Sequence, residues 1–249
     1  MDREDREPPL RERLSLKNPV CLSLDISDPV RGLALLRKTG PMAGMVKAGP
    51  VPFLAWGETL LRTAEKSNIP LFLDFKWHDI PNTVHETILH LPSPAIRMVT
   101  VHAMGGPTMI RAAREACQKL GPNRPVLLAV TALTHLTPEE LGAIGLDDGR
   151  EVAVKRLGSM ALEAGADGLV LSPRELLFAR SLWGRDPYLV TPGIRPKGSK
   201  VKNDDQTNAE TPGEALRRGA DLLVVGRPVL QAEDPVGALA GILREIENP

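Results

Sequence analysis

Asp74, Lys76 and Asp79 place two carboxylates and one amine in a short stretch of sequence where an apolar segment ends. The apolar run of residues 69–73 predicts a buried strand, and side chains two positions apart in a strand point to the same face. We therefore expect Asp74 and Lys76 side by side, as an acid and a base that one reacting group could meet. Asp79 follows the strand, just before a Pro and an Asn that suit the start of a helix, and it could approach the same lysine from another direction.

In most sequences an Asp and a Lys two residues apart form an ion pair at a solvated strand edge. Here the neighbours Leu71, Phe72, Leu73 and Phe75 indicate burial. Burying unpaired charges costs several kcal/mol, so such clusters persist mainly where they are used. This context favours a functional site over a structural ion pair.

The composition of the chain limits its partners. A chain of 249 residues fits one large domain. Lys and Arg total 31, as do Asp and Glu, so no net charge attracts nucleic acid or an anionic membrane. The apolar segments are far shorter than the roughly 20 residues that a membrane span requires. We expect a small-molecule partner, with no nucleic acid and no membrane.

Cysteine and histidine usage gives no sign of a disulfide framework or a metal site. Cys21 and Cys117 are far apart and form no CxxC motif, and the five histidines lack metal-binding spacing. We therefore expect a soluble, cytoplasmic protein without a metal. Residues 1–18, which begin with a charged stretch and lack a secretory signal, are interpreted as a polar, frayed extension before a folded domain at 19–249.

One pattern repeats along the chain: a short apolar run, a polar or Gly-containing turn, and an amphipathic segment. Eight such units predict a single TIM-type (β/α)8 barrel, because strands that are apolar throughout indicate a parallel sheet buried on both faces. A doubly wound open sheet is the alternative, although the Gly-rich dinucleotide turn is absent after the first strand. The predicted strands are 20–26, 44–48, 70–76, 96–102, 126–133, 168–172, 188–191 and 222–226, and the predicted helices are 29–38, 54–67, 82–90, 107–120, 150–163, 174–183, 211–218 and 235–246.

In such barrels the catalytic groups lie at the C-terminal ends of the strands. Charged residues occur there on the first three predicted strands, and Thr134 follows the fifth. The charges alternate in sign, so a buried row of them is self-neutralising and still produces strong local fields. The row comprises Asp25, Lys47, Asp74 and Lys76.

Residues that could bind an anion follow the last two predicted strands, where these barrels commonly hold phosphate. Gly193 and Arg195 come after the seventh strand and precede a polar loop that reaches Gln206. After the eighth strand, Gly226 would permit a close backbone approach and Arg227 a bidentate contact. Gly-Arg-Pro alone could equally be a surface turn, but its position favours a phosphate site.

Residues 74–83 read DFKWHDIPNT and resemble the D-x-K-x-x-D-I-P-N-T element of the orotidine 5'-phosphate decarboxylase family. The similarity covers all but about the first 18 residues and includes Asp25, Lys47, VHA at 101–103, TALT at 131–134, TPGIRP at 191–196 and GRP at 226–228. It implies a (β/α)8 barrel that converts orotidine 5'-phosphate to uridine 5'-phosphate (UMP) without a cofactor, in the last step of de novo pyrimidine nucleotide synthesis.

The resemblance also implies a role for each site residue. Lys76 would donate a proton to C6 of the pyrimidine, and Asp74 would lie beside the departing carboxylate. Asp25 and Lys47 would bind ribose hydroxyls and orient this pair, while Lys47 and Asp79 complete the catalytic set. The residues implied to bind the base or the 5'-phosphate are Thr134, Arg195, Gln206, Gly226 and Arg227.

Two further implications concern assembly and motion. Asp79 and Thr83 would enter the site of a neighbouring subunit, which implies a homodimer with shared active sites. The loop at residues 195–206, somewhat longer than the family pattern, would close over the substrate.

Two other functions fit parts of the pattern. A sugar-phosphate decarboxylase or aldolase-like relative would share the D-x-K-x-x-D strand and use magnesium for an enediolate, but residues 80–83 and 193–196 argue against it. A non-catalytic nucleotide-binding module would keep the phosphate site, yet binding alone needs no buried row of charges.

Overall fold

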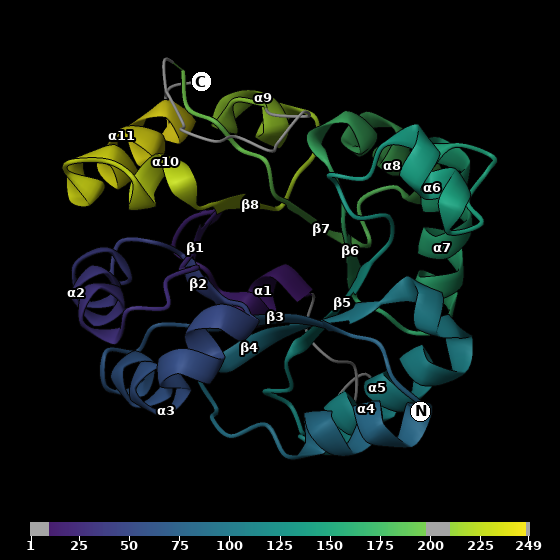
Figure 1. Ribbon diagram of the computed structural model, residues 1–249, viewed down its shortest axis with the longest axis horizontal. Coiled ribbons are helices and arrows are strands. Elements are labelled where there is room, and N and C mark those ends of the chain that lie inside the picture. The colour runs from purple at the N-terminus through teal and green to yellow at the C-terminus, as the bar shows by residue number, and fades with distance from the viewer. Residues whose placement is uncertain (1–9, 198–209, 248–249) are drawn as a thin grey trace.

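The computed structural model describes residues 10–197 and 210–247, and its centre is a closed parallel barrel of eight strands in sequential order (Figure 1). β1 pairs with β2 on one side and with β8 on the other, which closes the sheet on itself. The predicted (β/α)8 barrel is therefore confirmed. The strands are β1 (Val20–Ser23), β2 (Met45–Ala48), β3 (Leu71–Trp77), β4 (Ile96–His102), β5 (Val126–Val130), β6 (Gly168–Val170), β7 (Tyr188–Thr191) and β8 (Leu222–Val225).

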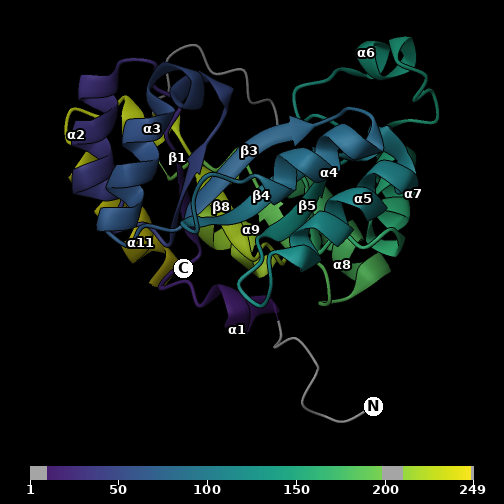
Figure 2. The same cartoon turned by 90° about the horizontal axis from the view of Figure 1, so that it is seen from below.

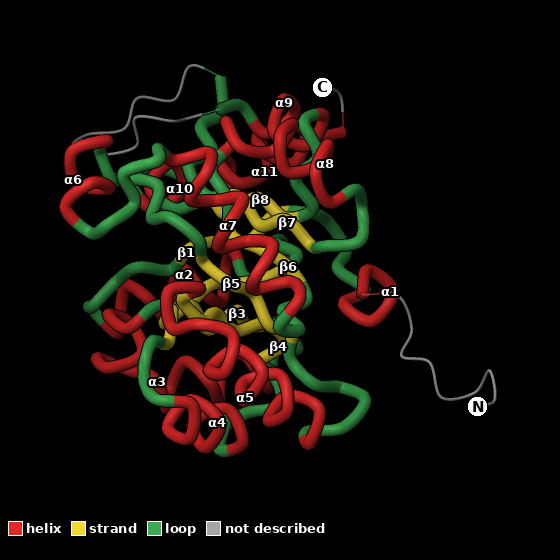
Figure 3. The backbone as a smooth tube through the Cα atoms, turned by 90° about the vertical axis from the view of Figure 1, so that its right-hand side faces the viewer, coloured by secondary structure: helices red, strands yellow, loops and turns green. Residues whose placement is uncertain are grey.

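Helices follow the strands and form a ring around the barrel (Figure 1), and the side view in Figure 3 shows the helices outside the strands. None of the described helices is both long enough and apolar enough to cross a membrane. The helices are α1 (Leu10–Leu14), α2 (Pro29–Thr39), α3 (Pro50–Lys66), α4 (Pro81–Leu89), α5 (Gly106–Lys119), α6 (Pro138–Ala143), α7 (Arg150–Glu163), α8 (Leu176–Trp183), α9 (Pro212–Arg217), α10 (Arg227–Leu230) and α11 (Pro235–Glu247), with 3-10 turns η2 (Ala103–Gly105) and η3 (Pro173–Glu175).

Strand side chains alternate between the lumen of the barrel and the surrounding helices. In β3, Phe72 packs in the lumen, whereas Leu71 and Leu73 pack in the layer between barrel and helices. Every residue of β1, β5, β7 and β8 is buried, which explains why these strands read as largely apolar runs. The lumen is a packed core, so ligands have access from the ends of the barrel.

Helix α1 lies at the end of the barrel opposite to α6 (Figure 2). Leu14 is 7% exposed and belongs to the lumen cluster that includes Tyr188. Leu10 and Leu16 pack against the same cluster. The apolar side chains of these residues thus cover the N-terminal end of the barrel. The division between an extension and a domain at residue 18 stays a prediction.

Several strands end earlier than the apolar pattern predicts. β1 ends at Ser23 and β5 at Val130, so Asp25 and Thr134 lie in the loops that follow them. Two unpredicted helices, α6 and α10, follow β5 and β8. In α6, Thr137 and Glu140 form a capping box, in which each side chain accepts a hydrogen bond from the backbone of the other. This capping box fixes the start of α6 in the segment that follows β5.

Buried ion pairs fix the strands at the opposite, N-terminal end. Asp167, which directly precedes β6, accepts hydrogen bonds from the Arg124 guanidinium at 2.7 and 2.8 Å and from the Leu127 N–H at 2.9 Å. Burial alone would raise the pKa of Asp167, but the hydrogen bonds and charge of Arg124 lower it. Asp221, directly before β8, is bound in the same way by Arg180 at 2.6 Å. These contacts make the barrel a rigid base for the side chains at its mouth.

Candidate active site

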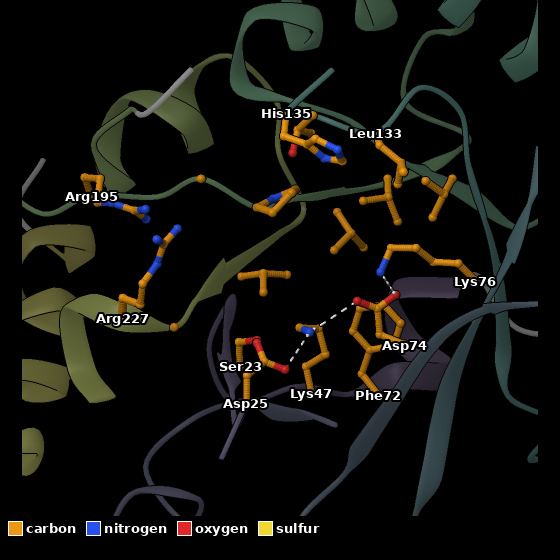
Figure 4. Close-up of a pocket in the computed structure, with 18 of the residues that line it drawn as sticks. Ser23, Asp25, Lys47, Phe72, Asp74, Lys76, Leu133, His135, Arg195 and Arg227 are labelled. Carbon is orange, nitrogen blue, oxygen red and sulfur yellow. Dashed lines mark hydrogen bonds and ion pairs between the residues drawn. The ribbon is translucent and has the colours of Figure 1, made fainter. Parts of the chain in front are cut away.

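A cavity of about 530 Å³ opens at the C-terminal end of the barrel (Figure 4). Its floor is formed by apolar side chains that include Phe72, Val130 and Val190. The charged side chains gather at two separate places around this floor, one beside β1 to β3 and the other after β7 and β8. The cavity therefore offers an apolar centre with polar groups on two sides.

The first group is the row of alternating charges. Lys47 Nζ lies 3.5 Å from Asp25 Oδ1 and 3.2 Å from Asp74 Oδ2. Lys76 Nζ lies 2.9 Å from Asp74 Oδ1. The structure thus joins these four residues, which come from the β1, β2 and β3 segments, into one continuous network.

Burial and charge act in opposite directions on the two inner members of this row. Burial alone would lower the pKa of Lys47, but the carboxylates of Asp74 and Asp25 outweigh it and raise the pKa. Burial alone would raise the pKa of Asp74, but Lys47, Lys76 and hydrogen bonds lower it. At neutral pH Asp74 is therefore a carboxylate and Lys47 an ammonium. The two ends of the row are more open, since the Asp25 side chain is 52% exposed and that of Lys76 36%.

The backbone of β3 changes conformation at Lys76. Phe72, Asp74 and Lys76 all line the cavity, as strand alternation requires. Lys76 itself has φ 50°, and the register with β4 shifts between Leu73 and Trp77. A non-glycine residue in this left-handed region costs about 1 to 3 kcal/mol, and such conformations cluster at functional sites. The surrounding contacts must therefore hold Lys76 in place.

The second group of charges lies across the cavity. Arg195 follows β7 and Arg227 follows β8, and their guanidinium groups point toward each other (Figure 4). Gly193 and Gly226 line the same side. A Cβ atom at Gly226 would come within 3.3 Å of Ser23 Cβ, so a larger residue there would crowd the cavity wall. Two cations directed at one space are suited to bind an anion such as phosphate.

The loop after β5 forms a further part of the wall. Thr134 and His135 line the cavity, and their loop is tied back by Arg150 of α7. Arg150 Nη2 donates to the carbonyl oxygens of Leu133 at 3.1 Å and Leu136 at 2.6 Å. Thr134 is thus placed where the sequence predicted, although its role stays a prediction.

Two predicted residues, Asp79 and Thr83, lie outside this cavity. Asp79 is exposed, and its Oδ1 accepts a hydrogen bond from the Ile80 N–H at 2.6 Å. Thr83 is exposed on α4. Neither is part of the cavity lining. Gln206, and with it most of the loop predicted to close, falls outside the described residues.

Sequence reasoning missed two hydroxyl groups that support the charged row. Ser23 Oγ donates to Asp25 Oδ2 at 2.6 Å, and Thr100 Oγ1 donates to Asp74 Oδ1 at 2.9 Å. Strand alternation could have indicated Ser23, because it lies two positions before Asp25. Thr100 gave no comparable signal, since β4 contributes no charged residue to the row.

Within the described residues, no group of three or more His, Cys, Asp and Glu side chains is placed to hold a metal ion. The carboxylates of the row are instead engaged by the lysines and by hydroxyl groups.

Known proteins share both the sequence and the fold. Residues 18–242 match the model of the orotidine 5'-phosphate decarboxylase / HUMPS family. Two proteins named orotidine 5'-phosphate decarboxylase are similar: one from Moorella thermoacetica is 41% identical over 240 residues, 94% of either chain, and one from Pelobacter propionicus is 44% identical over 204 residues, 82% of this chain and 84% of the other. The crystal structure of orotidine 5'-phosphate decarboxylase from Lactobacillus acidophilus is similar with a TM-score of 0.78 and 33% identity, covering 94% of this chain and 100% of that chain.

The fold and these relatives define a (β/α)8-barrel enzyme of the carboxy-lyase class, as predicted. The chain belongs to the orotidine 5'-phosphate decarboxylase / HUMPS family. The resemblance that the sequence indicated is thereby confirmed.

Proposed function

We propose that the chain decarboxylates orotidine 5'-phosphate to UMP, the last step of de novo pyrimidine nucleotide synthesis, with Lys76 as the proton donor. The similar proteins are named orotidine 5'-phosphate decarboxylase, which supports this activity over that of the HUMPS members of the family. The observation that carries the proposal is one cavity with the Asp-Lys-Asp-Lys row on one side and two arginines on the other. A nucleoside monophosphate with a carboxylated base has complementary groups for both sides.

Lys76 supplies the chemistry that this reaction requires. Breaking the bond between C6 and the carboxylate leaves an electron pair on C6 that the pyrimidine ring delocalises poorly. An ammonium fixed beside C6 stabilises this developing charge electrostatically and then donates its proton to C6. CO2 departs, UMP forms, and the neutral Lys76 amine regains a proton from solvent.

Asp74 and Lys47 set the conditions for that step. Asp74 holds the Lys76 ammonium at 2.9 Å and would lie beside the substrate carboxylate, where like charge opposes binding of the reactant more than of the transition state. Lys47 neutralises the other oxygen of Asp74. Lys47 and the half-exposed Asp25 remain available to bind the ribose hydroxyls.

The phosphate side supplies binding energy. For very slow uncatalysed reactions, an enzyme must lower the activation free energy by on the order of 20 kcal/mol, which is more than one ammonium provides. Arg195, Arg227 and the backbone at Gly226 would hold the 5'-phosphate, and this remote binding energy is used to orient the base against Lys76. Thr134 would meet the base, and Gln206 is included in the phosphate site on the resemblance alone.

The site would be completed by a second subunit. Asp79 and Thr83 point outside the cavity of their own chain, at the rim formed by the end of β3 and the start of α4. Exposed apolar side chains occur at the same rim, including Ile80 at 66% and Met104 at 40% exposure. Such side chains favour contact with another protein surface. We therefore assign Asp79 and Thr83 to the site of the partner in a two-fold homodimer.

The remaining assignments concern setting and cofactors. Both cysteines are buried and neither forms a disulfide, which agrees with a reducing cytoplasm. Every step above uses protein side chains and substrate, so the proposed reaction needs no cofactor.

The proposed function predicts loss of orotidine 5'-phosphate absorbance when the purified chain is added, at an undiminished rate with EDTA present. UMP should form in equal amount, as measured by chromatography. A chain that leaves orotidine 5'-phosphate intact would refute the proposal. Activity that disappears with EDTA and returns with magnesium would instead favour metal-dependent chemistry of the sugar-phosphate type.

Arg227→Ala is expected to lower kcat/KM for orotidine 5'-phosphate by about 10- to 150-fold, since hydrogen bonds to charged groups contribute about 1.5 to 3 kcal/mol. The measurement compares this loss with the loss for orotidine, which lacks the phosphate and should be affected little. Arg62→Ala is the matched control, because Arg62 is 72% exposed on α3 and pairs with Glu58. Equal losses for both substrates would contradict the assignment of Arg227 to the phosphate.

A further inference from the structure

Thr100 lies within β4, fully buried, and its hydroxyl contacts both members of the Asp74–Lys76 pair. The backbone N–H of Lys76 donates to Thr100 Oγ1 at 2.9 Å, and Thr100 Oγ1 donates to Asp74 Oδ1 at 2.9 Å. A hydroxyl has one hydrogen to donate and lone pairs to accept, so one group serves both contacts at once.

The contact with the Lys76 N–H occurs where the sheet is irregular. The register between β3 and β4 shifts between Leu71 and Phe72 and again between Leu73 and Trp77. Lys76, inside this shift, has φ 50°. A backbone in this region persists only when its surroundings fix it. The Thr100 hydroxyl satisfies the Lys76 N–H at this irregular position.

The contact with Asp74 completes the coordination of its carboxylate. Oδ2 faces Lys47 Nζ at 3.2 Å, while Oδ1 receives both Lys76 Nζ and Thr100 Oγ1 at 2.9 Å. With the two lysines as its only partners, the Asp74 carboxylate could still rotate while keeping both ion pairs. A third donor from the neighbouring strand restricts that rotation, because it comes from a rigid β4 backbone.

We propose that Thr100 is a positioning residue for decarboxylation, whose hydroxyl fixes the Asp74 carboxylate and the Lys76 backbone relative to each other. This inference rests on the proposed function, in which the Lys76 ammonium must lie against C6. Thr100 acts through its two neighbours, and misplacement of a reacting group by about 1 Å can cost on the order of 100-fold in rate.

Three variants separate the hydroxyl from the packing of the side chain. Thr100→Val keeps the volume and removes the hydroxyl, and Thr100→Ser keeps the hydroxyl and removes a methyl group. Thr131→Val is the matched control, since Thr131 is also buried beside a barrel strand and its hydroxyl has no hydrogen-bond partner in the described part of the chain. Expected results are a kcat lower by about 10- to 100-fold with KM within about threefold for Thr100→Val, and near wild-type kcat for the other two variants.

The pH profile provides a readout that loss of packing would not move. The charged groups nearest to Asp74 are Lys47 of β2 and Lys76 on its own strand. Cys21 and Asp25 act on the row from the β1 side. On β4, His102 interacts electrostatically with Lys76. All of these groups remain in Thr100→Val. Removing a hydrogen bond to the carboxylate raises the pKa of Asp74, so the acidic limb of kcat should move to higher pH. In Thr100→Ser it should stay in place.

Hydrogen exchange of the Lys76 amide tests the geometry independently of turnover. The amide should exchange faster in Thr100→Val than in wild type, and Thr100→Ser should restore slow exchange. A Thr100→Val enzyme with wild-type kcat and an unmoved acidic limb would overturn the positioning role and leave the proposed function intact. A wild-type chain without turnover of orotidine 5'-phosphate would overturn the proposed function, and the amide exchange rates would then decide alone whether Thr100 positions Lys76.

Discussion

Lys76→Ala is expected to lower kcat for orotidine 5'-phosphate by about four orders of magnitude or more, because it removes both the ammonium that stabilises the carbanion and the proton donor. The folded protein should persist. Asp74 keeps Lys47 and Thr100 as partners, and alanine at φ 50° meets the same backbone cost as the lysine it replaces. Turnover, UMP binding by calorimetry and the thermal unfolding midpoint measure these three expectations.

Lys155→Ala is the matched control for that variant, since Lys155 is exposed on α7 and is not part of the cavity lining. It should retain wild-type turnover. If Lys76→Ala kept more than a few per cent of wild-type kcat, Lys76 would not be the proton donor. A variant that neither binds UMP nor unfolds cooperatively would show instead that the lysine has a structural role.

The barrel could be predicted from sequence because its strands are buried on both faces and therefore stand out as short apolar runs. The ends of those runs were predicted less well. Leu24 and Ile26 are buried although β1 ends at Ser23, so the apolar pattern continues past the end of the strand into the loop. Burial and strand pairing are separate properties, and the sequence reports burial more directly.

The charged row could be predicted as a set because each member follows a strand and strand ends converge in a closed barrel. The contacts within the row could not be predicted from the sequence. The backbone N–H of Lys76, which has a left-handed conformation, donates to the hydroxyl of Thr100 in β4, 24 positions further along the chain. Similarly, Arg195 and Arg227 lie close together because they follow β7 and β8, which are neighbouring strands of the barrel. Such geometry arises from packing between strands.

Asp79 shows a different limit. Strand alternation places Asp74 and Lys76 on one face, but it carries no information beyond the last strand residue. In the structure β3 ends at Trp77, and Asp79 turns away from the cavity toward solvent. Whether it acts in another subunit is therefore a question for an experiment on mixed dimers.

Mixing Lys76→Ala with Asp79→Asn chains is expected to restore activity to two preparations that are each nearly inactive. If each site combines Lys76 of one chain with Asp79 of the other, a mixed dimer contains one doubly damaged site and one intact site. Random reassociation of equal amounts makes about half the dimers mixed, so about a quarter of all sites should regain wild-type turnover. The measurement is kcat per site before and after subunit exchange.

A second pair of variants controls for changes in stability on mixing. Asp74 and Lys76 contact each other within one chain, so mixing Asp74→Asn with Lys76→Ala leaves one lesion in every site and should restore nothing. Subunit exchange is followed independently by mass spectrometry of isotopically labelled chains. Complete exchange without recovery in the first mixture would mean that Lys76 and Asp79 serve the same chain. Recovery to about a quarter there, with none in the control, requires two chains at each site, because no rearrangement within one chain could supply the missing lysine.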